Sequence, residues 1–231
     1  MSVSIILPCY KPPENWANNI ITNYFQLKEI ISEEIEIIVI QDGICNGVND
    51  SDIKKISESI SNFKFIKYEI NKGKGYAIRQ GVTISTDDII IYTDIDFPYT
   101  INSILNVYKS LKEGKYDIAV GVKNQSYYMQ VPFSRRIISK GFRKLIRFFL
   151  SIPTTDTQCG LKGFVKEIKP AFLKTTIDRY LFDLEFIRNS YKSGYKIITI
   201  PIDLNENVHF RVLNYRILLP EMFNFIKLLL K

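Results

Sequence analysis

The stretch IIIYTDID, residues 89–96, decides which fold the sequence predicts. Its first half is a run of β-branched and aromatic residues without polar alternation, which is typical of a strand buried on both faces of a parallel sheet. Its second half places Asp94 and Asp96 two residues apart, at the point where this strand should end. Ligands of open α/β sheets bind beyond the carboxyl ends of the strands. The stretch therefore predicts a central strand with an acidic ligand site at its end.

Two carboxylates so close together repel each other unless a cation lies between them. Magnesium binds one or two protein carboxylates together with phosphate oxygens of a substrate. Asp94 and Asp96 therefore favour a site for Mg²⁺ or Mn²⁺ that carries a diphosphate. An isolated Asp-x-Asp pair is more often a solvated turn, so this interpretation depends on the rest of the chain.

Length and composition indicate one globular domain. The chain has 231 residues, of which 46% are hydrophobic and 24% are charged, as in ordinary domains with a substantial core. Its net charge of +7 suits phosphates, anionic lipid or nucleic acid, and does not choose among them.

The cysteines and the apolar segments favour a cytoplasmic protein. Three cysteines without Cys-x-x-Cys spacing predict neither a disulfide framework nor a zinc site. The N-terminus runs directly into a short apolar strand, unlike a signal peptide. The sequence has no uninterrupted run of about 18 apolar residues, so we expect no membrane-spanning helix.

Strand and helix patterns alternate along the chain. We expect strands at residues 3–7, 36–40, 64–68, 89–93, 117–121 and 197–200. The helical patterns lie at residues 15–31, 51–60, 76–84, 101–113 and 134–150. This alternation predicts an α/β fold with a mostly parallel sheet and right-handed crossovers. No repeat or linker interrupts it, so we expect one domain over residues 1–211 and an amphipathic helix over 212–231.

Residues suited to nucleotide binding follow three of the predicted strands. Tyr10 could stack on a base, and Asp42 could accept a hydrogen bond from a base or a ribose. Lys72 and Lys74, among glycines, open a helix whose free N–H groups and dipole favour an anion. Taken singly, each is more often a surface aromatic, an N-cap acid or a solvated basic turn. Their coincidence with the acid pair at one sheet edge favours a nucleotide site.

Five segments follow one another along the chain: SIILPCYKP at 4–12, EIIVIQDG at 36–43, NKGKGYAIRQGV at 71–82, IIIYTDID at 89–96 and DIAVGVK at 117–123. In this order they resemble glycosyltransferase family 2, whose members have the GT-A fold and use nucleotide-sugar donors. Two further strings resemble a narrower branch, the dolichyl-phosphate mannose and glucose synthases and their bacterial polyprenyl-phosphate relatives. These strings are TDTQCGLKGF at 155–164 and FDLEF at 182–186.

The resemblance assigns roles to individual residues. It implies that the nucleotide sugar is bound by Pro8, Tyr10, Asp42, Lys72, Lys74, Asp94 and Arg211. It also implies a catalytic set of Asp94, Asp96, Asp156 and Gln158, with the metal on the first two. Asp183 and Glu185 would lie beside this centre, although either could instead serve the start of a helix.

The sequence departs from the family pattern at three places. One acid, Asp42, stands where the family often has two, so it alone would bind the nucleoside. Lys123 replaces a common Arg, which removes a bidentate phosphate fork and keeps a point charge. Pro98 stands where mannosyl members often have a Gln that helps to hold metal. The metal would therefore depend on Asp96 and the donor phosphates, with Asp94 nearer the sugar or ribose.

Residues 134–150 predict a basic amphipathic helix. Such a helix suits an anionic membrane surface, although a core-facing helix with a solvated basic face would have the same composition. The resemblance favours the membrane, where a polyprenyl phosphate presents its head group, and implies acceptor binding by Lys123, Ser134, Arg135 and Arg136. The tail over 212–231 predicts an interfacial helix or one that packs in a homodimer.

These features together predict an inverting, metal-dependent glycosyltransferase at the cytoplasmic face of a membrane. It would move a sugar from a UDP- or GDP-sugar to a polyprenyl phosphate. The alternative acceptor is a sugar hydroxyl in surface-polysaccharide assembly, which would need a general base. Asp156 is the candidate for that base, whereas a phosphate acceptor is already an oxyanion near neutral pH.

Two other classes fit the sequence less well. A nucleotidyltransferase shares the sheet architecture but needs a glycine-rich basic loop after the first strand, and residues 8–13 do not provide one. A basic binder of nucleic acid or membrane without enzymatic activity would show no metal-dependent nucleotide binding. We expect no nucleic-acid partner.

Overall fold

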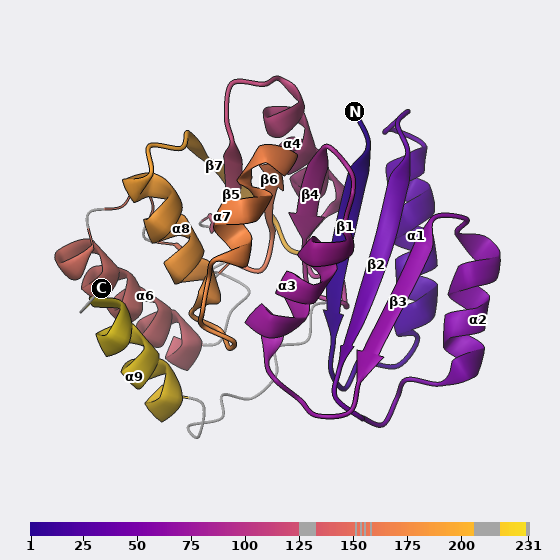
Figure 1. The fold of residues 1–231 in the computed structure, drawn as a ribbon, viewed down its shortest axis with the longest axis horizontal. Helices are drawn as coiled ribbons and strands as arrows, with labels where there is room; N and C mark the ends of the chain where they lie inside the picture. The colour runs from indigo at the N-terminus through magenta and orange to yellow at the C-terminus, as the bar shows by residue number, and fades with distance from the viewer. Residues whose placement is uncertain are drawn as a thin grey trace.

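Seven strands form one sheet that lies between two layers of helices in the computed structural model (Figure 1). The structure describes residues 1–124, 133–150, 152, 154, 156, 157, 159–205 and 218–229. The strands are β1 Val3–Cys9, β2 Ile35–Asp42, β3 Phe63–Tyr68, β4 Ile89–Tyr92, β5 Ile118–Lys123, β6 Lys162–Val165 and β7 Ile197–Ile202. The sheet order is β3-β2-β1-β4-β6-β5-β7.

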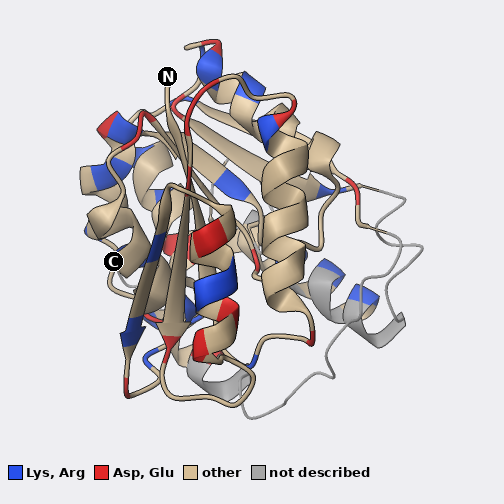
Figure 2. Cartoon of the chain, turned by 90° about the vertical axis from the view of Figure 1, so that its right-hand side faces the viewer, with Lys and Arg blue, Asp and Glu red and all other residues tan. Residues whose placement is uncertain are grey.

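The helices belong to two groups, one on each face of the sheet. The first group consists of α1 Trp16–Lys28, α2 Asp50–Ser59 and α4 Ile101–Lys112. The second consists of α3 Lys74–Ile84, α6 Phe133–Phe149, the 3₁₀ turn η1 Lys166–Ile168, α7 Lys169–Leu173, α8 Phe182–Lys192 and α9 Leu218–Leu229. Charged residues lie mainly on the helices and the connecting segments, while the strands are mostly uncharged (Figure 2).

The predicted α/β fold and its strand–helix alternation are confirmed. All six expected strands and all five expected helices are present, with ends that differ by a few residues. Neighbouring pairs are parallel at β1–β2, β1–β4, β2–β3 and β5–β7. The described part of the predicted C-terminal helix is α9, and the division into residues 1–211 and 212–231 stays a prediction.

The central strands are buried on both faces, as their unbroken apolar runs predict. Along β4, Ile89 and Ile91 pack into the core formed with α1 and α4, while Ile90 and Tyr92 pack into the core formed with α3 and α8. All four are fully buried. The same alternation holds along β1 and β2, so both helical layers are anchored on the same three strands.

β6 is the strand that the sequence did not predict. It lies between β4 and β5 and runs antiparallel to both. Its four residues, KGFV, include a lysine and a glycine, so neither hydrophobic alternation nor an apolar run marks it as a strand. Gly163 is required there because a side chain would lie 2.9 Å from Val107 and Leu111 of α4.

Lys162 is fully buried at the start of β6, opposite Tyr92 in the register. Its ammonium group lies 3.0 Å from the carboxylate of Asp183 on α8 and donates to the carbonyl oxygen of Cys159. The Tyr92 hydroxyl donates to the same carboxylate at 2.6 Å. A buried charge is tolerated only when it is paired and hydrogen-bonded, so this pair fixes β6 against both β4 and α8.

Replacing Lys162 by Met is expected to lower the free energy of unfolding by about 3–5 kcal/mol, because Asp183 then stays buried without its cation. Adding Asp183→Asn removes the remaining charge and keeps an acceptor for Tyr92, so the double variant should regain part of the loss. Urea denaturation measures both. Exposed Lys174→Met serves as the control and should change stability by less than about 0.5 kcal/mol. If Lys162→Met alone were as stable as the original chain, the role given to this ion pair would be contradicted.

Candidate active site

Side chains from four segments meet beyond the carboxyl ends of the parallel strands. Tyr10 follows β1, Asp42 ends β2 and Asp94 follows β4, while α3 begins beside them. Because β1, β2 and β4 run parallel, these ends lie on one edge of the sheet, at the lower side of Figure 1. The structure therefore places these residues at one edge of the sheet, as the strand pattern predicts, and their joint role in nucleotide binding stays a prediction.

An ion pair at this edge joins Lys74 to Asp94. The Lys74 ammonium lies 2.6 Å from Oδ1 of Asp94. Burial alone would lower the pKa of Lys74, but the carboxylates of Asp94 and Asp183 raise it above its usual value. Lys74 is therefore a permanent cation at the acid pair, whereas the Asp94 carboxylate stays partly open to solvent.

The turn after β4 has a constrained backbone. Phe97 is buried and has a φ of 45°, a left-handed conformation that is uncommon for a bulky residue. Its N–H donates to the carbonyl oxygen of Asp94 at 3.0 Å. This turn fixes the backbone on both sides of Asp96, whose side chain is exposed.

The loop before β6 packs directly on Asp94. A side chain at Gly160 would overlap Oδ2 of Asp94, and the Gly160 N–H donates to the Tyr99 hydroxyl at 2.8 Å. Sequence reasoning placed residues 155–164 near the reaction centre only through a resemblance. The signal within the sequence is the glycine itself, because only glycine allows so close an approach to the carboxylate.

The acid pair fits a divalent cation that takes its other ligands from a substrate. Among the described residues, no three His, Cys, Asp or Glu side chains gather closely enough to form a complete metal site. Asp94 and Asp96 would supply two carboxylates, and Mg²⁺ characteristically binds one or two of these together with phosphate oxygens. The residues present therefore match a metal–diphosphate complex better than a metal held by protein alone.

Asp42 lies at the end of β2, as expected, and its carboxylate has several hydrogen-bond partners within the chain. It is buried, and its carboxylate accepts from the Tyr68 hydroxyl at 2.8 Å, the N–H groups of Lys72 and Gly73 at 2.7 and 2.9 Å, and the Asn71 amide at 3.0 Å. In this arrangement the carboxylate holds the loop that leads into α3. Its direct contact with a nucleoside stays a prediction.

Three backbone N–H groups at the entry to α3 donate to acceptors within the chain. The Lys72 and Gly73 N–H groups donate to the Asp42 carboxylate, and the Tyr76 N–H donates to the carbonyl oxygen of Asp178 at 3.1 Å. Gly73 has a φ of 114°, and a side chain there would overlap the carbonyl oxygen of Asp178. The expected anion site at the start of α3, with Lys72 and Lys74, stays a prediction.

The remaining donor-side residues surround this loop. The ammonium of Lys72 lies 4.4 Å from the ring centre of Tyr76 and 3.2 Å from its hydroxyl oxygen. Tyr10 is 40% exposed, so its ring is available for stacking. Pro8 lies at intermediate burial within β1.

Lys123 and Asp156 form a second buried ion pair. The Lys123 N–H donates to Asp156 at 2.7 Å, and its ammonium lies 3.4 Å from the other carboxylate oxygen. The Asp156 side chain is only 2% exposed. Sequence reasoning assigned these two residues to the acceptor and to general-base chemistry without predicting that they bind each other.

Glu185 supports a loop in the structure, and its place beside the reaction centre stays a prediction. Its carboxylate is buried and accepts from the Thr176 N–H at 2.7 Å, the Ile177 N–H at 2.9 Å and the Thr176 hydroxyl at 2.9 Å. It therefore holds the 176–177 loop. Asp183 influences the site indirectly. It forms an ion pair with Lys162, and its charge raises the pKa of Lys74.

Four other predicted site residues lie wholly or partly outside the described part of the chain. Gln158 and Arg211 lie outside the described residues. Ser134 and Arg135 belong to the first turn of α6, whose side chains there also lie outside the described part. Arg136 is half-buried on the same helix.

Two curated proteins are similar to the chain over most of its length. Glycosyltransferase AglD of Haloferax volcanii is 23% identical over 206 residues, covering 88% of this chain and 33% of that protein. The dolichyl-phosphate beta-glucosyltransferase of Dictyostelium discoideum is 25% identical over 192 residues, covering 78% of this chain and 58% of that protein. The chain therefore spans less than two thirds of the length of either relative.

A solved structure shows the same fold. Glucosyl-3-phosphoglycerate synthase from Mycobacterium tuberculosis, in complex with Mn²⁺, UDP and phosphoglyceric acid, aligns with a TM-score of 0.63 at 14% identity. The alignment covers 99% of this chain and 77% of that one. The family model for glycosyl transferase family 2 matches residues 4–169. With its GT-A sheet and this match over more than half of its length, the chain belongs to glycosyl transferase family 2.

Proposed function

We propose that the chain transfers a sugar, with inversion, from a nucleotide-diphosphate sugar to a polyprenyl phosphate with the help of a divalent cation. The donor part of this proposal rests on one observation, the contact of Lys74 with Asp94 at the end of β4. The acceptor part is supported by the dolichyl-phosphate glucosyltransferase among its relatives. Cytoplasmic location and a homodimer stay predictions.

The ion pair of Lys74 and Asp94 would open when the donor binds, and each side chain would then bind a new partner. A diphosphate brings phosphate oxygens that can bind the Lys74 ammonium, which releases the Asp94 carboxylate. When bound, a divalent cation would neutralise the charge that develops on the departing diphosphate. Mn²⁺ and UDP in the Mycobacterium tuberculosis enzyme support this assignment. Lys74 would then stabilise the leaving group from the side of α3.

The environment of Asp156 favours a phosphate acceptor over a hydroxyl acceptor. A general base must reach the proton that it removes, but Asp156 is buried and both of its carboxylate oxygens face Lys123. A phosphate acceptor requires no such base. We therefore assign Asp156 to holding the end of β5 through Lys123, with acceptor binding by Lys123 and Arg136 as a proposal.

Two helices support the proposal of a membrane surface. α6 presents exposed Ile137, Leu145, Phe148 and Phe149, and α9 presents exposed Met222, Phe223 and Ile226. They pack together through Phe149 and Phe225, whose ring centres are 6.4 Å apart, and lie side by side in Figure 1. Basic residues of α6 flank the apolar ones, which suits an anionic interface. Among the described helices, none has both the length and the hydropathy for a membrane span.

Lys74→Gln is expected to strengthen Mn²⁺ binding in the absence of nucleotide and to weaken UDP binding. Losing a charge-assisted contact worth about 1.5–3 kcal/mol should change each affinity by roughly ten- to a hundredfold. Isothermal titration calorimetry measures both ligands, and exposed Lys67→Gln is the charge-matched control. In Asp96→Asn, metal-dependent UDP binding should be lost. Unchanged metal affinity in Lys74→Gln would contradict the exchange of partners.

The acceptor assignment is tested at the buried pair of Lys123 and Asp156. Asp156→Asn keeps an acceptor for the Lys123 N–H, and because a phosphate acceptor needs no general base, transfer should fall by less than roughly tenfold. A loss of about 10²–10⁴-fold in Asp156→Asn, with unchanged stability in urea denaturation, would indicate a general base and a hydroxyl acceptor. Arg136→Ala should raise the acceptor KM with little effect on donor affinity.

Membrane binding should require both the charges and the apolar side chains of α6. Phe148→Glu places a charge where the helix would enter the interface, so flotation with anionic liposomes should fall sharply. Ile70→Glu changes an equally exposed side chain on the loop before α3 and should have no effect. Flotation should also decrease with added salt. Equal recovery of Phe148→Glu and the unchanged chain on anionic vesicles would argue against this interface.

A further inference from the structure

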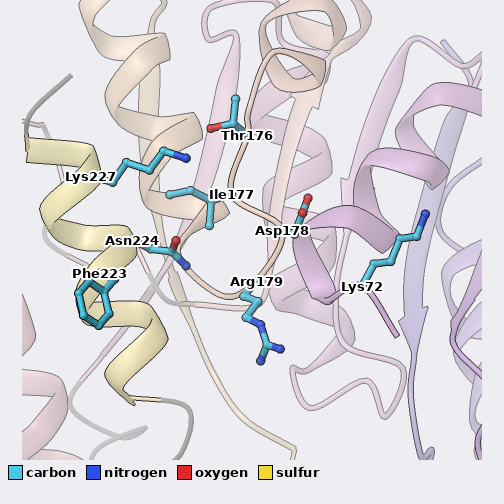
Figure 3. Close-up of a pocket in the computed structure, with 8 residues that line it drawn as sticks. All are labelled: Lys72, Thr176, Ile177, Asp178, Arg179, Phe223, Asn224 and Lys227. Carbon is cyan, nitrogen blue, oxygen red and sulfur yellow. The ribbon is translucent and has the colours of Figure 1, made fainter. Parts of the chain in front are cut away.

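A cavity of about 470 Å³ lies between α9, the loop at 176–179 and the start of α3, away from the residues assigned to the sugar transfer except Lys72. Its lining includes three basic side chains, Lys72, Arg179 and Lys227, and one acid, Asp178. Figure 3 shows the Lys227 ammonium directed toward the loop at Ile177, and Asn224 directed toward the same loop. The lining is therefore basic, with a polar amide beside it.

The single acid of the lining does not cancel this positive charge. Asp178 forms an ion pair with Arg79 of α3, which is not part of the lining. Arg179 also interacts electrostatically with the Glu221 carboxylate of α9, and the Lys72 ammonium lies over the ring of Tyr76. With Arg79 and Glu221 included, four cations face two carboxylates around this cavity, so its potential stays positive and attracts an anion.

The walls of the cavity are held in place by buried contacts. Glu185 fixes the 176–177 loop through two backbone N–H groups. α9 is anchored by buried Phe225 and Leu228 and by Glu221, which accepts from the Leu181 N–H at 3.0 Å. The two elements that carry Arg179 and Lys227 therefore have fixed positions, as a binding site requires.

The rim of the cavity is apolar on one side. Phe223 lines the cavity and is 71% exposed, one helical turn from Lys227. Met222 and Ile226 continue this exposed surface along α9. A soluble anion has no use for an apolar rim, whereas a phospholipid presents a phosphate next to its hydrocarbon chains. The volume also exceeds what a bare phosphate needs and lies within the range of about 300–1,000 Å³ for small-molecule sites.

We infer that this cavity binds the phosphate-bearing head group of an acidic membrane phospholipid, with Arg179 and Lys227 on the phosphate and Phe223 against the lipid chains. The inference rests on the proposed position of α9 at a membrane surface, and does not depend on the sugar transfer. Binding there would orient the sheet edge of Asp94 relative to the bilayer that supplies the acceptor.

The test uses the full chain and dihexanoyl phosphatidic acid, a short lipid that stays in solution below its micelle concentration. Isothermal titration calorimetry should show saturable binding, and Arg179→Gln with Lys227→Gln should weaken it roughly tenfold or more, since both basic side chains attract the phosphate. The control is Lys140→Gln with Lys144→Gln, two exposed lysines of α6, which removes the same charge and should leave this affinity unchanged.

Three results would overturn the inference. The first is an equal loss of lipid affinity in the cavity variant (Arg179→Gln with Lys227→Gln) and in the α6 variant (Lys140→Gln with Lys144→Gln). This result would show that net charge alone attracts the lipid. Binding of inorganic phosphate as tight as that of the short lipid would assign the cavity to a free phosphate. The third is an unchanged affinity of Phe223→Ser for the short lipid. This result would show that the apolar rim does not contact the lipid chains.

Transfer of sugar to a short-chain polyprenyl phosphate in detergent separates this inference from the proposed function. The cavity variant should keep that activity, because Arg179 and Lys227 belong to neither the donor nor the acceptor site. Absence of transfer in the unchanged chain, together with lipid binding in the cavity, would contradict the proposed function and leave this inference standing.

Discussion

The buried charge of Lys162 imposes the arrangement on which the candidate site depends. A lysine without access to solvent must find its partners inside the protein, and here these are the Asp183 carboxylate and the Cys159 carbonyl oxygen. The first partner attaches β6 to α8, and the second fixes the loop that ends at Gly160. That loop lies against Asp94. One ion pair in the middle of the sheet thus positions the residue at which the donor is proposed to bind.

The acidic residues around this edge differ in the hydrogen-bond and ion-pair partners of their carboxylates. Asp42 and Glu185 accept several hydrogen bonds from backbone N–H groups, and Asp156 is enclosed by Lys123. Such carboxylates stabilise loops. Asp94 instead pairs with the Lys74 ammonium and remains partly exposed, and Asp96 beside it is exposed. Carboxylates with this accessibility can bind a metal together with phosphate oxygens of a substrate.

α9 connects the candidate site to the proposed membrane surface. Its buried residues pack into the same core as α3 and α8, while its exposed residues continue the apolar surface of α6. The loop at 176–179 lines the same cavity as α9, and the carbonyl oxygen of its Asp178 accepts a hydrogen bond from the Tyr76 N–H of α3. This loop therefore lies between α9 and the start of α3.

The sequence alone determined the sheet, most of its helices and the edge that carries the site. Apolar strands such as 89–92 must be buried on both faces, and parallel strands bring their carboxyl ends together, so the place of Asp94, Tyr10 and Lys74 followed from pattern. Tertiary structure decided the rest. β6 has no apolar run, and its position depends on where Lys162 finds a carboxylate 21 residues away along the chain. In the same way, hydrogen bonds between distant segments make Asp42, Asp156 and Glu185 supports for neighbouring backbone. A side chain's partners depend on packing that no local pattern encodes.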